Sequence, residues 1–168
     1  MFQYAFLYNY SIENDIDRYV QDPKYFAENA EEIRAIFQEG IYAIPIDMVA
    51  IHVRRGDYVG HNFYIDLIET DYYQNAMAEF LGSKFVVFSD DIQWCKEQDV
   101  FKGCEFSHGT EIEDMNNMAS CVGHIIANSS FSWWAAYISP YSKKIVAPKK
   151  WHPDGIERTV CPPNWIRI

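Results

Sequence analysis

The chain has 168 residues, enough for one domain with a single sizeable hydrophobic core. Hydrophobic residues make up 49% and charged residues 23%, a balance typical of a globular protein and not of a disordered one. Acidic residues outnumber basic ones by 24 to 14, and the net charge of −10 would repel the backbone of DNA or RNA, so we expect no nucleic-acid partner.

The chain after residue 47 alternates between strand-like and helix-like patterns. Apolar runs rich in β-branched and aromatic residues predict strands at residues 48–53, 84–89, 104–106, 122–127 and 144–148. Helical spacing predicts helices at residues 70–82, 90–98, 110–121 and 129–138. Strands that alternate with helices in this way indicate an α/β fold, in which a Rossmann-like, doubly wound parallel sheet is covered by helices on both faces.

Polar residues at the starts of the first three helices are typical capping signals. Thr70 is the expected N-cap of the first helix, and Asp90 and Asp91 are good N-caps for the second. Thr110 followed by Glu113 predicts a capping box at the start of the third helix.

The first 47 residues do not follow this pattern. Residues 28–40 predict a helix that ends at a glycine, and the segment before it is polar and aromatic. We therefore divide the chain into an N-terminal region at 1–47, which includes a connecting helix, and a main domain at 48–168.

The composition also bears on where the protein works. No apolar run approaches the roughly 20 residues needed to span a bilayer, and the opening residues lack the basic start of a signal peptide. The four cysteines are irregularly spaced without a CxxC pair, which argues against a zinc site, and Cys121 reads as a core residue. We expect a cytoplasmic protein, with peripheral attachment to the inner membrane face left open.

Polar residues follow four of the predicted strands. In a sheet of this kind, ligands bind beyond the carboxyl ends of the strands, so these side chains should gather on one rim. In strand order they are His52, Arg54, Arg55 and Asp57; Ser89, Asp90 and Asp91; Ser107 and His108; and Asn128, Ser129 and Ser130.

The paired arginines are the leading candidates for ligand binding. A guanidinium offers a fixed fork of donors that matches phosphate oxygens. Neighbouring strand residues point to opposite faces, but a turn at Gly56 would let Arg54 and Arg55 share one ligand. Alternatively, one of the two pairs with Asp57 or another carboxylate of the rim.

Two further features suit a nucleotide. Ser129 and Ser130 open a helix whose backbone N–H groups would favour an anion, although simple N-capping explains them equally well. Asp114 could accept hydrogen bonds from a guanine edge, or it could be an exposed helix acid. The sequence has no GxSxG, Walker or GxGxxG motif and no DxD-like metal site, so a diphosphate stabilised by arginine without metal is the simpler hypothesis.

Several motifs together resemble one family. HVRRGDY at 52–58 is similar to the HxRRxDY motif of α-1,2-fucosyltransferases, glycosyltransferase family 11. The segments FVVFSDDIQWCKEQ, DMNNMASCVGHIIANSSFSWWAAYI and KIVAPKKW resemble later motifs of that family. The opening MFQYAF resembles the end of its GxGNQMFQYA signature. The similarity covers residues 48–152 almost continuously.

This resemblance implies a GT-B fold, of which the main domain would be the C-terminal, donor-binding half. It also implies metal-independent transfer of L-fucose, with inversion, from GDP-β-L-fucose to the 2-hydroxyl of a terminal galactose on a glycan. No cofactor is implied beyond the donor substrate.

The resemblance also implies roles for individual residues. Arg54 would bind the β-phosphate and stabilise the departing GDP, and Arg55 would support that site or its fold. His52 and Asp114 would hold the guanine, and Ser129–Ser130 the phosphates.

The chain departs from the family before the arginine motif. It reaches that motif after some 45 residues, where the family has a whole acceptor-side domain, so it resembles a fucosyltransferase without most of its N-terminal half. The general base stays unassigned, because Asp57, the best-placed carboxylate in the sequence, is flanked by arginines and is more readily explained as an ion-paired scaffold residue. Three hypotheses follow: an active fucosyltransferase acting on a bacterial glycan, a non-catalytic nucleotide-sugar-binding domain, or a fold that associates through an exposed cleft face.

Overall fold

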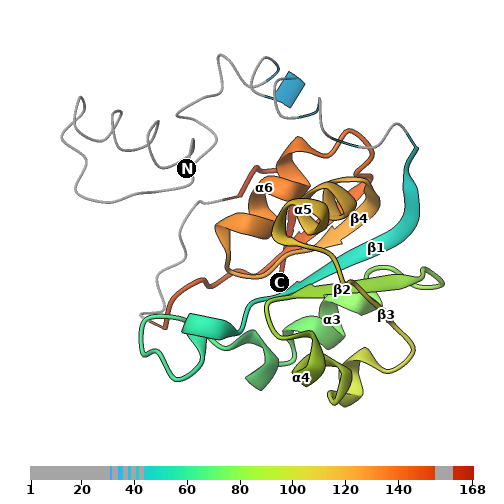
Figure 1. Cartoon of the computed structure of the whole chain (residues 1–168). Coiled ribbons are helices and arrows are strands. Elements are labelled where there is room, and N and C mark those ends of the chain that lie inside the picture. The colour runs from blue at the N-terminus through green and yellow to red at the C-terminus, as the bar shows by residue number, and fades with distance from the viewer. Residues whose placement is uncertain (1–30, 32–33, 36–37, 39–40, 42–43, 154–160) are drawn as a thin grey trace.

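The computed structural model describes residues 31, 34–35, 38, 41, 44–153 and 161–168 (Figure 1). Most of the predicted N-terminal region therefore lies outside the described residues. The four described residues of the helix predicted at 28–40 have helical backbone: Glu31, Arg34, Ala35 and Gln38. Gln38 donates a hydrogen bond of 2.8 Å from Nε2 to the carbonyl of Ile138, so this segment contacts the main domain.

Six parallel strands form one sheet within the described residues, in the order β3-β2-β1-β4-β5-β6. They are β1 (Ile46–Val53), β2 (Phe85–Ser89), β3 (Glu105–Phe106), β4 (Cys121–Ile125), β5 (Lys144–Ala147) and β6 (Ile166–Arg167). The five predicted strands are all present. The sixth was missed: β3 is equally short but lies between two predicted helices, whereas no helix was predicted between β5 and β6.

Four α-helices connect and cover the strands in the main domain as described: α3 (Tyr72–Ala78), α4 (Ile92–Lys96), α5 (Glu111–Ala119) and α6 (Ser130–Ile138). Figure 1 shows α3 and α4 on one face of the sheet and α5 and α6 on the other. Among the described residues, no helix combines the length and the apolar character needed to cross a membrane. The arrangement confirms the predicted doubly wound α/β fold.

Alternation along β1 explains why both faces need a cover. Val49, Ile51 and Val53 are buried in the core cluster that includes residues of α3 and α4. Ala50, between them, is buried in a cluster with Met118 of α5 and residues of α6. Successive side chains of a strand point to opposite faces, so an uninterrupted apolar strand is stable only when helices cover both sides.

The predicted helix starts are partly confirmed. Thr110 and Glu113 form the expected capping box at the start of α5. Thr70 is not the N-cap of α3, because it ends a short 3-10 helix and Asp71 occupies the capping position. Thr70 contributes through its Oγ1, which accepts a hydrogen bond of 3.2 Å from the backbone N–H of Tyr72.

The strand order places a topological switch point between β1 and β4, in the middle of the sheet. The chain moves from β1 outward to β2 and β3, and then returns to the other side of β1 to form β4. The connections that leave β1 and β4 therefore diverge at the carboxyl ends of these two strands. In doubly wound sheets this switch point is where ligands bind.

Candidate functional site

The turn after β1 separates the two arginines. Gly56 has φ of +30° and begins a short 3-10 helix, Gly56–Tyr58. A Cβ at Gly56 would lie 2.5 Å from Oδ2 of Asp90, so the turn brings the backbone close to the end of β2. Although the chain turns here, the side chains of Arg54 and Arg55 have different neighbours.

Arg54 lies at this switch point, directly after β1, with 32% of its side chain exposed. Its Nη2 is 2.5 Å from Oδ1 of Asp57, and its Nη1 is 3.1 Å from Oδ2 of Asp90. The guanidinium also lies 5.4 Å from the ring centroid of Tyr58. Asp57 is 68% exposed and can move aside, so Arg54 retains donors for a ligand.

The guanidinium of Arg54 stays protonated. Partial burial lowers its pKa, but the hydrogen bond to Asp57 and the charge of Asp90 outweigh that effect and raise the pKa above its ordinary value. The guanidinium is therefore a permanent positive charge at the switch point.

Arg55 is enclosed by the protein. Its side chain is 11% exposed, Nη1 is 2.7 Å from Oδ2 of Asp66, and the guanidinium lies 3.6 Å from the ring centroid of Trp94. Its Nε is buried without a hydrogen-bond partner in the described part of the chain. We expected at most one arginine to be paired with a carboxylate, and the structure pairs both.

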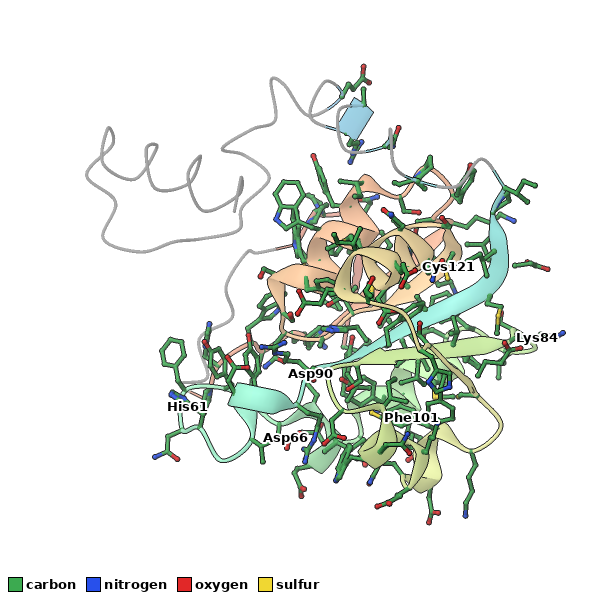
Figure 2. All side chains as sticks on the ribbon, in the orientation of Figure 1. His61, Asp66, Lys84, Asp90, Phe101 and Cys121 are labelled. Carbon is green, nitrogen blue, oxygen red and sulfur yellow. The ribbon has the colours of Figure 1, made fainter. Side chains whose placement is uncertain are left out.

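Asp90 has a different role from the one its sequence position indicates. Asp91, not Asp90, caps α4 by accepting a hydrogen bond of 3.2 Å from the backbone N–H of Trp94. Asp90 instead accepts a hydrogen bond of 2.8 Å from the backbone N–H of Arg55 through Oδ1, while its Oδ2 faces Arg54. Figure 2 shows Asp90 at the end of β2 and Lys84 at the opposite end of that strand.

His52 is buried under the same rim. It is 4% exposed, and its ring centroid lies 5.4 Å from that of Phe131 in α6. Its Nδ1 is buried and has no hydrogen-bond partner among the described residues. Burial, helped by the charge of Arg54, lowers the pKa of His52 to about 3, so the imidazole is neutral.

Asn128, at the end of β4, joins three segments of the rim. Its amide donates hydrogen bonds of 3.0 Å to the carbonyl of Ile65 and 3.1 Å to that of Trp151. Its own carbonyl accepts a hydrogen bond of 3.3 Å from the hydroxyl of Tyr58. The sequence placed Asn128 on the rim, but these partners are 23 to 70 positions away, and no local pattern could reveal them.

The serines at the start of α6 lie where they were predicted. Ser129 is the N-cap, and its Oγ accepts a hydrogen bond of 3.3 Å from the backbone N–H of Phe131. Ser130 is the first helical residue and is exposed. The capping role of Ser129 is confirmed, and anion binding by this pair stays a prediction.

Asp114 lies in the first turn of α5, at the carboxyl end of β3 and so two strands away from β1. It is half-buried, and its Oδ1 accepts a hydrogen bond from Oγ of Ser107. A Cβ at Gly109 would lie 2.7 Å from the same oxygen, so the backbone passes closely over the carboxylate. The structure thus separates Asp114 from the arginine turn, and a ligand that met both would have to extend along the rim.

The rim offers charge and hydrogen bonds in place of metal ligands. The residues that the structure describes include no group of three or more His, Cys, Asp or Glu that could hold a metal ion. What the rim offers around β1 and β4 is a partly exposed cation at Arg54, a neutral imidazole at His52 and the start of α6. These groups suit an elongated anion that carries a hydrogen-bonding ring.

Comparison with known proteins identifies the family. The sequence pattern of Glycosyl transferase family 11 matches residues 4–168. An alpha-1,2-colitosyltransferase from Escherichia coli is 33% identical over 204 positions, covering 99% of this chain and 67% of the relative. An O-antigen biosynthesis glycosyltransferase from Escherichia coli is 30% identical, covering 71% of this chain and 44% of the relative.

A mammalian protein matches a shorter segment. The galactoside 2-alpha-L-fucosyltransferase Sec1 of Mus musculus is 30% identical over 108 residues, which is 56% of this chain and 29% of that relative. The chain thus spans between about a third and two thirds of these relatives. Since the family pattern covers nearly all of it, the chain belongs to Glycosyl transferase family 11.

Proposed function

We propose that residues 48–168 form the donor-binding half of a GT-B fold and that the protein is an α-1,2-fucosyltransferase. The reaction would transfer L-fucose, with inversion, from GDP-β-L-fucose to the 2-hydroxyl of a terminal galactose on a glycan. The observation that carries this proposal is the position of Arg54, a permanent, partly exposed cation at the switch point of a doubly wound sheet.

Arg54 would act on the leaving group. As the bond between the sugar and the phosphate breaks, negative charge grows on the β-phosphate, and a guanidinium already in place stabilises it. One preorganised donor of this kind contributes roughly 3 kcal/mol, or about a hundredfold in rate. The positive charge comes from the protein, so we propose that the reaction needs no metal.

The other rim residues would place the nucleotide. The unpartnered Nδ1 of His52 is available to the guanine, and Asp114 would accept hydrogen bonds from its N1–H and amino group. Ser129 and Ser130, at the start of α6, would face the phosphates. Arg55, held by Asp66 and Trp94, would support the turn and not contact the ligand.

The donor sugar needs its own test. One relative is named for colitose and another for fucose, and colitose is fucose without the 3-hydroxyl. The described rim has no feature that selects between them, and we propose fucose on the strength of the arginine motif. Parallel assays with the two GDP-sugars would decide this point.

A second candidate is a nucleotide-sugar-binding domain that does not catalyse transfer. The alignment with the colitosyltransferase has 204 positions, more than the 168 residues of this chain, so it contains gaps where only the relative has residues. Gaps confined to the acceptor side would leave the donor rim intact.

Incubation with GDP-fucose and a β-galactoside acceptor separates the two candidates. The transferase predicts a fucosylated product and release of GDP, both lost in Arg54→Ala. Binding of GDP without any product from a panel of galactosides would reject the transferase and favour the binding domain. Absence of both product and binding would reject both.

A further inference from the structure

Aromatic side chains gather on the loop that follows the arginine turn. We call the following residues the aromatic rim cluster: Tyr58, His61, Phe63, Tyr64 and His152. Figure 2 shows His61 farther from the sheet than Asp90, so the cluster extends outward from the rim. None of the roles proposed above uses these rings.

The rings of the cluster are held in a defined arrangement. Tyr58 and Tyr64 stack with centroids 3.7 Å apart and planes 7° from parallel. Phe63 meets Tyr64 edge-on at 5.3 Å, and its other neighbour is His152 at 4.5 Å. Such stacked and edge-on contacts each add to the stability of an arrangement of rings.

The backbone of Phe63 is fixed as well. Its carbonyl lies 3.0 Å from Nδ1 of His152, and its N–H donates a hydrogen bond of 3.2 Å to Nδ1 of His61. Phe63 is nevertheless 53% exposed. A phenyl ring held from several directions and still open to solvent presents a prepared apolar surface.

The chemistry of this surface suits a neutral sugar. A pyranose has a face of C–H groups that packs on an aromatic ring, and hydroxyls around its edge that need hydrogen-bond partners. Phe63 supplies the ring, the imidazole of His152 lies next to that ring, and the imidazole of His61 contacts the backbone of Phe63. Burial, and then the neighbouring Tyr64, raise the pKa of Tyr58 to about 12, so its phenol is uncharged.

The position of the cluster indicates which sugar it would meet. Tyr58 lies 5.4 Å from the guanidinium of Arg54, where the proposed function places the β-phosphate. The donor sugar is bonded to that phosphate and would lie closest to Tyr58. Phe63 is separated from Tyr58 by the ring of Tyr64, so it is one sugar farther out.

We propose that the aromatic rim cluster binds the terminal galactose of the acceptor, with Phe63 packed against the apolar face of the pyranose. This inference rests on the proposed function, because the location of the phosphate defines which sugar is the acceptor. It places part of the acceptor site on the domain that binds the donor. The attacking hydroxyl has to come within about 3–3.5 Å of the donor sugar. A cluster whose inner member, Tyr58, lies 5.4 Å from the guanidinium of Arg54 would allow this approach.

The test is a titration of the full chain with methyl β-D-galactoside, with and without GDP, in which saturation-transfer NMR detects binding. We expect Phe63→Ser to weaken galactoside binding about tenfold, the effect of one aromatic contact, and Phe63→Trp to retain it. The matched control is Leu81→Ser, because Leu81 is 89% exposed and follows α3, outside the cluster. The affinity for GDP should be the same in all three variants.

Three results would overturn the proposal. One is equal galactoside affinity in Phe63→Ser and Leu81→Ser, and another is a parent chain that binds no galactoside with or without GDP. The third is a Phe63→Ser variant that loses affinity for GDP-fucose but keeps its affinity for GDP and for the galactoside, which would assign the ring to the donor sugar. Failure of the proposed function is distinguishable, because it would appear as absent GDP binding in the parent chain.

Discussion

Arg54 and Arg55 are neighbours in sequence but occupy two different regions of the rim. Arg54 is partly exposed at the switch point, between the exposed carboxylate of Asp57 and the carboxylate of Asp90, whereas Arg55 is closed in by Asp66 and the ring of Trp94. One arginine is free to exchange a carboxylate for a ligand, and the other is part of the scaffold that fixes the turn. A paired arginine motif can thus divide ligand binding and structural support between its two members.

The largest effect should come from removing the exposed arginine. We expect Arg54→Ala to weaken GDP binding about a hundredfold or more, roughly 3 kcal/mol, because the diphosphate loses its charged partner. Stability should change by less than about 1 kcal/mol, since exposed ion pairs contribute little. Calorimetric titration and urea denaturation measure the two quantities.

A matched control for this variant is Lys102→Ala. Lys102 also forms an exposed ion pair, 2.7 Å from Asp99, but it lies beyond α4 and outside the rim. It should leave GDP binding unchanged. Equal GDP affinity in Arg54→Ala and the parent chain would remove Arg54 from the proposed site.

The enclosed arginine should affect stability more than binding. Arg55→Ala leaves the carboxylate of Asp66 without its partner and uncovers Trp94, and we expect the free energy of unfolding to fall by about 2–3 kcal/mol. Arg55→Lys keeps the charge but loses the planar stack, so its loss should be smaller. A large loss of GDP affinity in folded Arg55→Lys, at unchanged stability, would mean that Arg55 is itself a ligand-binding residue.

The turn that follows the two arginines should be destabilised by an added methyl group at Gly56. Gly56→Ala places a Cβ against Asp90 at positive φ, and we expect a loss of about 1–2 kcal/mol in the free energy of unfolding. Gly60→Ala is the control, because Gly60 also has positive φ, +72°, but a Cβ there meets nothing within 4 Å. Thermal denaturation should show the larger loss for Gly56→Ala. Equal losses would indicate that only backbone strain, and not the contact with Asp90, matters.

The smallest effect concerns the pH dependence that His52 adds. Its pKa is about 3 in the folded protein and 6.5 when exposed, so the unfolded chain binds the extra proton as the pH falls. Stability should therefore fall by about 1 kcal/mol between pH 7 and pH 5.5 on account of His52 alone. His52→Asn should remove this component from the denaturation curves, and an NMR titration of His52 with a midpoint near 6.5 would contradict it.

A second buried histidine sharpens this expectation. Burial also lowers the pKa of His124, to about 4, but its ring nitrogens lie 2.8 Å from the carbonyl of Met118 and 2.9 Å from Oγ of Ser142. His124 is thus satisfied inside the core, whereas His52 keeps an unpartnered Nδ1 at the rim. Addition of GDP should shift the NMR signals of His52 and leave those of His124 in place.

Much of the fold could be predicted because its signals are local. The apolar runs of β1, β2 and β4 and the capping box of Thr110 and Glu113 each occupy a few consecutive residues, and all appear in the structure. β3 and β6 each have two residues, which carry no period; β3 was found from its place between two predicted helices, whereas β6 follows a stretch in which no helix was predicted. Thr70 was expected to cap α3, and Asp90 and Asp91 were both expected to suit the cap of α4. The structure uses Asp71 and Asp91, because adjacent residues can cap a helix equally well and only the packed chain selects between them.

The site was predictable in outline but not in its division of roles. The rim position of Arg54 follows from the strand pattern and the rule for doubly wound sheets. The enclosure of Arg55 depends on Asp66 and Trp94, which lie in separate segments that only the tertiary fold brings together. The unpartnered nitrogen of His52 is likewise a property of the assembled core.

The most direct test of the account is calorimetric titration of the purified chain with GDP, with ADP as the control. The account predicts one site per chain that binds GDP and discriminates against ADP, through the cation of Arg54 and the guanine contacts of Asp114 and His52. No binding of either nucleotide would contradict it, because the family motifs would then remain in a fold that no longer forms the donor site.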